Sequence, residues 1–235
     1  MGTLLMRSNA MKPKKTIYLF ILPALILYGV FSLYPTFYGL FISFTNWDGL
    51  SPNYDFVGIR NYKNLLTNDS VFAKSIGNNF KFMLFVVTFQ TVLSLIFALF
   101  LVKNTKTNVA LRTLFFFPTI LSAVAVAFIW LSMYDTNFGL IKAVLGLFGI
   151  ENSPGWLANP NIAIFSVAFV QVWAHTGQLM IIFIAGLQAI PEELYEVSKI
   201  EGASRFQTFW GVTWPLIAPA AAIVIAYTTL QSSKS

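Results

Sequence analysis

Three polar side chains recur along one apolar stretch of this sequence. Gln171, His175 and Gln178 stand at positions i, i+4 and i+7, which places all three on one face of a helix. Such groups are costly in hydrocarbon, so this face is expected to point inward or toward water. It could line a path for a neutral, hydrogen-bonding solute, or it could hold neighbouring helices together. Gln90, alone in an earlier apolar stretch, leaves the same two alternatives open.

Few other groups in the apolar stretches could do chemistry. Apart from His175, the one ionisable side chain is Lys81, which stands at the end of a stretch and can extend to the membrane surface. The sequence shows no paired carboxylates, no Ser/His/Asp arrangement and no glycine-rich phosphate-binding loop. With one histidine and no cysteine, it offers no set of metal ligands. We therefore expect no catalytic residue, no metal, no cofactor and no ATP binding by this chain alone. Ion-coupled carriers normally have ionisable residues along their path, so any energy source is expected elsewhere.

The elements that must position these residues belong in a lipid bilayer. The chain has 235 residues, of which 57% are hydrophobic and 10% are charged. Soluble domains carry about 25% charged residues, so this chain could not cover a soluble surface. The net charge of +6 comes mostly from Lys and Arg at the ends of apolar runs. That distribution indicates membrane topology and lipid contact rather than nucleic-acid binding.

Five apolar runs approach or exceed the roughly 20 residues that a membrane-crossing helix needs. We expect an all-α, polytopic membrane protein, with a short basic segment at 1–15 and a transmembrane domain over 16–235. The first run is too long for a signal peptide and has no small-residue cleavage site after it, so it is expected to remain as a membrane helix. The expected spans are 17–44, 80–102, 113–134, 162–187 and 215–235.

Lys and Arg are divided unequally between the two sides of the membrane. Nine lie in 1–15, in the loop 103–112 and in the loop 188–214, against five in the longer loops on the other side. Because basic loops stay in the cytoplasm, the N-terminus and the loop 188–214 are both predicted to be cytoplasmic.

The loop 188–214 has the pattern of a helix, a glycine turn and a second helix. Pro191 suits the first position of a helix, and the glutamates that follow it suit the positive end of the helix dipole. Gly202 is expected to end that helix, and the spacing of Ser204 and Gln207 predicts a capping box that starts the next. Pro215 can then open the last span. The apolar face of the first helix consists of Leu194, Val197, Ile200 and, less regularly, Ala203.

The charge of this loop favours a protein partner over a lipid surface. Helices that lie on anionic lipid carry Lys and Arg on their polar face. Residues 192–205 instead hold four glutamates against two basic residues, Lys199 and Arg205.

The loop resembles the cytoplasmic EAA signature of ATP-binding-cassette importer permeases. That signature reads Glu-Ala-Ala, three residues, Gly, nine residues, Ile, one residue, Leu-Pro. Its Glu, Gly and Pro are in register here as Glu196, Gly202 and Pro215. The two alanines and the leucine are replaced by Val197, Ser198 and Trp214. The surrounding residues are similar to the carbohydrate-uptake branch of the maltose or glycerol-phosphate type, as are the segments 56–66, 111–118 and 186–191.

The resemblance implies a function and a set of partners. The chain would form a heterodimer with a second permease around a path for a small neutral solute, expected to be a sugar. Separate cytoplasmic ATP-binding subunits would drive transport, and an extracytoplasmic solute-binding protein would deliver the solute. The location would be a bacterial or archaeal cell membrane, in contact with lipid. The residues implied in ATPase coupling are Leu194, Glu196, Ile200, Gly202, Ala203 and Pro215.

The number of expected membrane helices differs from that of the family. Members of the family carry six core helices, and the sequence as written holds about five, so we expect a fragment or a degraded gene. The alternative function is a secondary carrier, or an intramembrane lipid-handling protein that uses His175, working without an ATPase.

Overall fold

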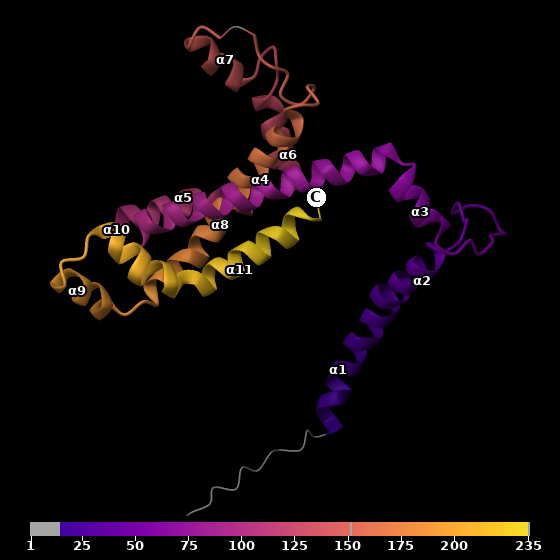
Figure 1. Ribbon diagram of the computed structural model, residues 1–235, viewed down its shortest axis with the longest axis horizontal. Helices are drawn as coiled ribbons and strands as arrows, with labels where there is room; N and C mark the ends of the chain where they lie inside the picture. Colours follow the sequence, from indigo (N-terminus) through magenta and orange to yellow (C-terminus); the bar gives the residue numbers. More distant parts are fainter. Residues whose placement is uncertain (1–14, 151, 235) are drawn as a thin grey trace, which may run out of the picture. The chain divides into compact units, whose positions relative to one another are not determined.

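The computed structural model describes residues 15–150 and 152–234 (Figure 1). The expected basic segment 1–15 therefore lies, except for Lys15, outside the described residues. Helices are the regular structure of the described part, and its β pairing is limited to an isolated bridge between Thr45 and Phe56. Four helices are long and apolar enough to cross a membrane, or five if a bent pair is counted as one span. The predicted all-α, polytopic fold is confirmed.

The chain divides into two compact units, Met1–Ala73 and Lys74–Ser235. The first unit contains one long helix made of α1 (Lys15–Tyr28), a π-helical turn (Gly29–Leu33) and α2 (Tyr34–Ile42). An ordered loop and the short helix α3 (Arg60–Thr67) follow.

Hydrogen bonds hold the loop between α2 and α3 in shape. The Asn61 side chain donates to the carbonyl oxygens of Ser43 (2.9 Å) and Thr45 (2.7 Å). Asp48 accepts from the backbone N–H groups of Ser51 (2.7 Å) and Leu50 (2.9 Å) and so closes a turn. These bonds give the loop a defined fold although most of its side chains are exposed.

Both π-helical turns of the described chain precede an aromatic–proline pair. The first, Gly29–Leu33, stands before Tyr34 and Pro35, and the second, Phe209–Thr213, stands before Trp214 and Pro215. A proline inside an α-helix cannot donate to the carbonyl four residues earlier, and its ring clashes with that group. A wider turn at this place removes the clash and lets the helix continue.

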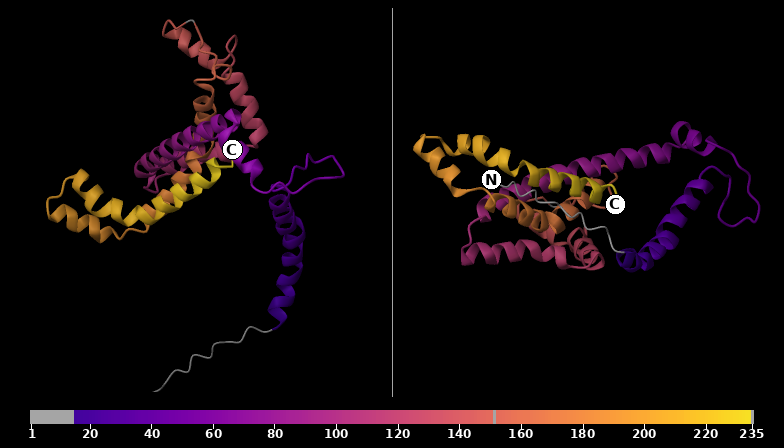
Figure 2. Two further views of the ribbon diagram at one scale, coloured as in Figure 1. Left: turned by 45° about the vertical axis from the view of Figure 1, so that its right-hand side comes forward. Right: turned by 90° about the horizontal axis from the view of Figure 1, so that it is seen from below.

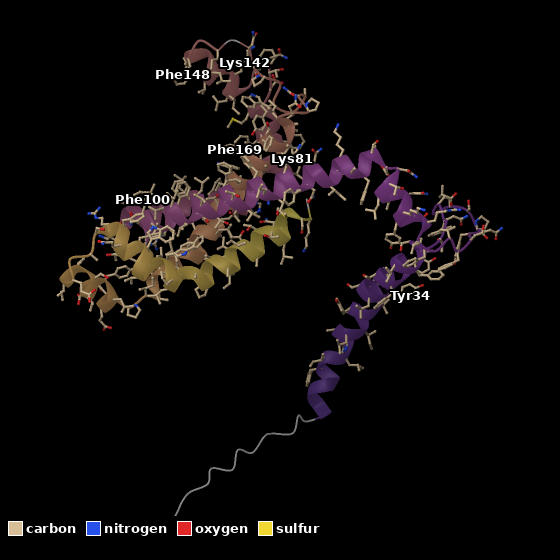
Figure 3. The ribbon with its side chains drawn as sticks, viewed as in Figure 1. Tyr34, Lys81, Phe100, Lys142, Phe148 and Phe169 are labelled. Carbon is tan, nitrogen blue, oxygen red and sulfur yellow. The ribbon has the colours of Figure 1, made fainter. Side chains whose placement is uncertain are left out.

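The second unit is a bundle of long helices that lie side by side (Figures 1 and 2). In Figure 3, Phe100 marks the end of α4 near α10, and Lys81 lies toward its other end. The helices that lie side by side are α4 (Ser70–Leu101), α5 (Lys106–Ile120), α8 (Ala163–Gln188) and α11 (Trp214–Ser232). Helix α6 (Ala123–Met133) follows α5 and points away from them toward α7 (Figure 1). Between them lie the short helices α7 (Leu140–Leu147), α9 (Glu192–Ile200) and α10 (Arg205–Thr208).

Helix α8 is the centre of this unit, and glycines bring its neighbours close. A Cβ on Gly177 would overlap the carbonyl of Phe115 on α5, and a Cβ on Gly186 would lie 2.9 Å from the Ala220 methyl on α11. The Thr119 hydroxyl also donates to the Ala174 carbonyl (2.8 Å). Small residues at helix contacts are typical of membrane bundles, where close backbone approach gives most of the packing energy.

The third expected span, 113–134, is not one straight helix. It consists of α5 and α6, whose axes are bent by 99°. Leu121 and Ser122 between them are extended, and the Ser122 hydroxyl accepts the N–H of Ala125 as the cap of α6. The missing N–H of Pro118 weakens the end of α5 just before this break.

The last helix also differs from expectation. Ser204 and Gln207 form the predicted capping box, with bonds of 3.3 Å and 2.8 Å. From there one helix runs through α10, the second π-helical turn and α11, over Arg205–Ser232. The last span therefore belongs to a helix that begins at Arg205 rather than at Pro215, because the π-helical turn lets Pro215 stand inside it.

Candidate functional site

Helix α9 begins and ends as its sequence dictates. Pro191 is its N-cap, one position earlier than expected, and Glu192 and Glu193 occupy the first turn. Gly202 follows the helix with φ +76°, the left-handed region that glycine adopts without strain. There the N–H of Gly202 bonds to the Lys199 carbonyl (3.1 Å), and the N–H of Ala203 bonds to the Ser198 carbonyl (2.9 Å). This pair of bonds is a Schellman motif, which satisfies the last carbonyls of the helix.

One side of α9 is attached to the bundle. Ser198 is buried and Tyr195 is partly buried, and they lie one helical turn apart. The Tyr195 hydroxyl is 3.2 Å from Oγ1 of Thr213, in the second π-helical turn. Tyr195 also packs against the buried core of the unit.

The predicted apolar face of α9 points the other way. Leu194, Val197 and Ile200 are 40%, 50% and 86% exposed. Glu196 is exposed beside them. An apolar stripe on a helix held by its opposite side is typical of a surface that a partner covers.

Aromatic side chains continue from this surface along the next helix. Phe206 and Trp210 are largely exposed. Trp210 makes edge-to-face contacts with Phe206 and with Trp214, at centroid distances of 6.2 Å and 5.9 Å. The exposed aromatic side chains thus extend the apolar surface beyond α9.

A cavity of about 450 Å³ lies where the α5–α6 bend faces α8. Gln171 and His175 line it from α8, and His175 Nδ1 is 3.3 Å from the Gln171 carbonyl oxygen. Trp130 and Tyr134 of α6 line it as well, with their rings 5.2 Å apart. The cavity is mainly apolar, with these few polar groups on its wall, which is the usual make-up of a small-molecule site.

The structure divides the three polar residues of α8. Gln171 and His175 reach the cavity, but Gln178 lies outside its lining and donates to the Tyr227 hydroxyl of α11 over 3.4 Å. The three residues therefore do not form one continuous wall of this cavity, and a role of Gln171 and His175 in a solute path stays a prediction. A helix-bonding role fits Gln178, because its bond connects two helices.

Trp130 and Tyr134 were not singled out as site residues from the sequence. Their positions suggested only the end of a span, where aromatic residues collect. The bend before α6 turns them toward α8 instead. The Tyr134 hydroxyl donates to the Ser166 carbonyl (2.9 Å), while the buried indole N–H of Trp130 has no partner among the described residues. That free donor adds to the hydrogen-bonding capacity of the cavity wall.

Gln90 has no part in this cavity. It is fully buried on α4, and neither its amide nitrogen nor its amide oxygen has a partner among the described residues. No group of three or more His, Asp or Glu side chains lies together in the described part of the chain, so no metal centre can be assigned there.

Comparison with known proteins places the chain in a family. The model of the binding-protein-dependent transport system inner membrane component matches residues 90–232. The multiple sugar-binding transport system permease of Streptococcus mutans is 38% identical over 205 residues, which cover 87% of this chain and 70% of that protein. The trehalose/maltose transport system permease of Thermococcus litoralis is 33% identical over 219 residues, covering 92% and 73%.

A solved structure has the same fold. The crystal structure of a bacterial ABC transporter involved in the import of alginate matches with a TM-score of 0.78 at 22% identity, covering 91% of this chain and 71% of that one. Residues 90–232, which match the family model, contain α9, the helix that follows it and all of the residues that line the cavity except Phe82. The chain belongs to the family of binding-protein-dependent transport system inner membrane components.

Proposed function

We propose that this chain is the permease subunit of an ATP-driven importer for a sugar or a similar neutral solute. Residues 16–235 form its transmembrane domain, and the loop 188–214 is its cytoplasmic coupling loop. A second permease completes the path, and separate ATP-binding subunits hydrolyse ATP. An extracytoplasmic binding protein delivers the solute. The named transport systems of the relatives support this proposal.

The observation that carries the proposal is the exposed apolar stripe of α9. A helix whose outer face bears Leu194, Val197 and Ile200 has the spacing of a helix that docks in a groove. Its glutamates argue against an anionic lipid surface, so a protein groove is the better partner. The groove belongs to the ATP-binding subunit in this account, because that subunit must pass its motion to the membrane helices.

The attachment of α9 suits the transfer of motion. The helix is closed by capping bonds at its C-terminal turn and is tied through Tyr195 to Thr213. When the ATP-binding subunits close, α9 moves as a rigid piece and carries the helices of the bundle with it. The path then alternates between its outward-facing and inward-facing forms by rigid-body motion.

The solute path takes its polar groups from α8. Gln171 and His175 offer an amide and an imidazole beside the rings of Trp130 and Tyr134. Hydroxyl groups of a sugar can bond to such side chains, and its apolar face can lie on aromatic rings. Gln178, at the α11 contact, enters the path when the helices change their positions.

The test is to express the chain together with its partner permease, ATP-binding and solute-binding subunits. Ile200→Asp places a charge in the exposed apolar stripe of α9. The complex is expected to lose its ATP-binding subunit and with it the uptake of solute. Leu66→Asp on α3 is the matched control, since Leu66 is also highly exposed, at 77%. Retention of the ATP-binding subunit and of uptake by Ile200→Asp would refute the proposal. Uptake driven by an ion gradient without that subunit would instead support a secondary carrier.

A further inference from the structure

The turn between α4 and α5 is organised by one arginine. The guanidinium of Arg112, on α5, reaches back to the end of α4. Its Nε donates to the carbonyl oxygen of Leu101 (2.8 Å), and Nη2 donates to the carbonyl oxygens of Val102 (2.8 Å) and Lys103 (3.2 Å). Nη1 donates to Oδ1 of Asn104 (2.9 Å). One side chain thus bonds to the carbonyl of the last residue of α4 and to acceptors on the three residues that follow it.

The guanidinium of Arg112 bonds to backbone carbonyl oxygens and to an amide oxygen, not to a carboxylate. Residues 102–112 contain no Asp or Glu, and they contain two further cations, Lys103 and Lys106. The C-terminal carbonyls of a helix carry partial negative charge, which attracts a cation. The planar guanidinium spreads five N–H donors over three nitrogens in a fixed fork, whereas a lysine ammonium carries three donors on a single nitrogen.

The same acceptors bind the end of α8. Nε2 of Gln188 donates to the Val102 carbonyl (3.0 Å) and to Asn104 Oδ1 (3.3 Å). Gln188 is the last residue of α8, and Ala189–Pro191 lead directly into α9. Arg112 and Gln188 therefore share two acceptors, and the α4–α5 turn is bonded to the helix end from which α9 departs.

We propose that Arg112, Asn104 and Gln188 form a joint that positions the α4–α5 pair relative to the base of α9. The inference rests on the proposed coupling function of α9. A displacement of α9 would otherwise be absorbed by bending at Ala189–Pro191. When these hydrogen bonds are formed, the displacement of α9 moves the end of α8 and the α4–α5 turn together. Arg112 is a positioning residue in this account, since it touches neither solute nor nucleotide.

The joint is tested in the complete transporter, reconstituted in vesicles with its solute-binding protein. Solute uptake and ATP hydrolysis are measured in the same sample, together with the amount of assembled complex. Arg112→Ala is expected to keep the ATP-binding subunit but to lower the solute moved per ATP by about tenfold, because several charge-assisted bonds are lost. Arg112→Lys should recover less than half of that ratio. Lys106→Ala, which removes an exposed cation from the same basic stretch, should leave it unchanged.

Arg112 and Gln188 bond to the same two acceptors, so the effects of replacing them should not be independent. Arg112→Ala combined with Gln188→Ala should lower the ratio by less than the product of the two single effects, since both side chains act on Val102 and Asn104. A merely structural role would lower assembled complex, uptake and hydrolysis together and would leave the ratio unchanged, which would overturn the inference. A wild-type complex without ATP-dependent uptake would overturn the proposed function itself.

Discussion

The hydroxyl of Tyr195 lies 3.2 Å from Oγ1 of Thr213, joining α9 to the π-helical turn of the helix that follows it. Thr213 is buried, and the next two residues are Trp214 and Pro215. Pro215 keeps this turn from closing into a regular α-helix. Helix α9 is therefore connected, through the side opposite its exposed apolar stripe, to the π-helical turn of the helix Arg205–Ser232.

Tyr195→Phe should loosen α9 without unfolding it. The variant loses one hydrogen bond, worth about 1 kcal/mol, and keeps the ring that packs on the core. Amide hydrogen exchange in α9 is expected to rise severalfold, and ATP-dependent uptake to fall. Tyr62→Phe is the matched control, because it removes a hydroxyl that contacts Ser43 in the other unit. Equal exchange in α9 for the two variants would show that the Tyr195 contact does not hold the helix.

Gly177→Ala should disturb the contact between α5 and α8. The added methyl would overlap the carbonyl of Phe115 and lie 2.8 Å from the Phe116 nitrogen, both of which are backbone atoms. Overpacking of this kind costs roughly 1–3 kcal/mol. We expect a lower midpoint of thermal unfolding in detergent. Gly146→Ala on α7 meets nothing within 4 Å and should be neutral or slightly stabilising. A similar midpoint for both variants would contradict the close approach.

His175→Ala should alter solute affinity and leave the complex assembled. The imidazole lines the cavity beside Gln171, so its loss removes one hydrogen-bonding group from the proposed path. One such bond corresponds to about a fivefold rise in the half-saturating concentration of uptake. His175→Gln, which keeps a polar group there, should come closer to the wild type. A complete loss of activity with normal assembly would favour the alternative in which His175 is a catalytic group.

The Asp48 turn should persist in mild acid, down to about pH 4. The backbone N–H groups of Ser51 and Leu50 and the Ser51 hydroxyl lower the pKa of Asp48 from 3.8 to about 2. A carboxyl whose pKa is lower in the folded state stabilises that state above its unfolded pKa, and this contribution is lost as the pH falls through the folded pKa. The turn is therefore expected to weaken between about pH 4 and pH 2. A titration of the Asp48 carboxyl carbon by NMR measures it, and a midpoint at 3.8 would contradict the bonded turn.

Much of the fold could be read from the sequence because its signals are local. Pro191, the glutamates after it and Gly202 fix the start and end of α9 within a few residues, and Ser204 with Gln207 predicts the next cap. Hydropathy predicts the long helices, because only an α-helix or a closed β-barrel satisfies every backbone hydrogen bond within lipid. These features depend on residues that are neighbours in the chain.

The remaining features depend on contacts between distant residues. Pro118 alone does not show that α5 and α6 meet at 99°, because the extended residues Leu121 and Ser122 also take part. The spacing predicts that Gln171 and Gln178 share one face of a helix. In the structure, Gln171 lines the cavity beside the α5–α6 bend, whereas Gln178 contacts α11. Arg112 reads as a topology signal in a basic loop, and only the structure gives its carbonyl partners.

The uptake of solute by a Glu196→Lys complex tests the central claim most directly. Glu196 is exposed on α9 next to the exposed apolar stripe, so its reversal should exclude the ATP-binding subunit while the chain still inserts in the membrane. Gly202→Asp, which strains a residue at φ +76°, should act in the same way. Asp55→Lys, the same charge reversal at an exposed residue outside α9, is the control and should retain most uptake. We expect ATP-dependent uptake by the Glu196→Lys complex to be abolished and the ATP-binding subunit no longer to co-purify. Wild-type uptake with that subunit still bound would contradict it.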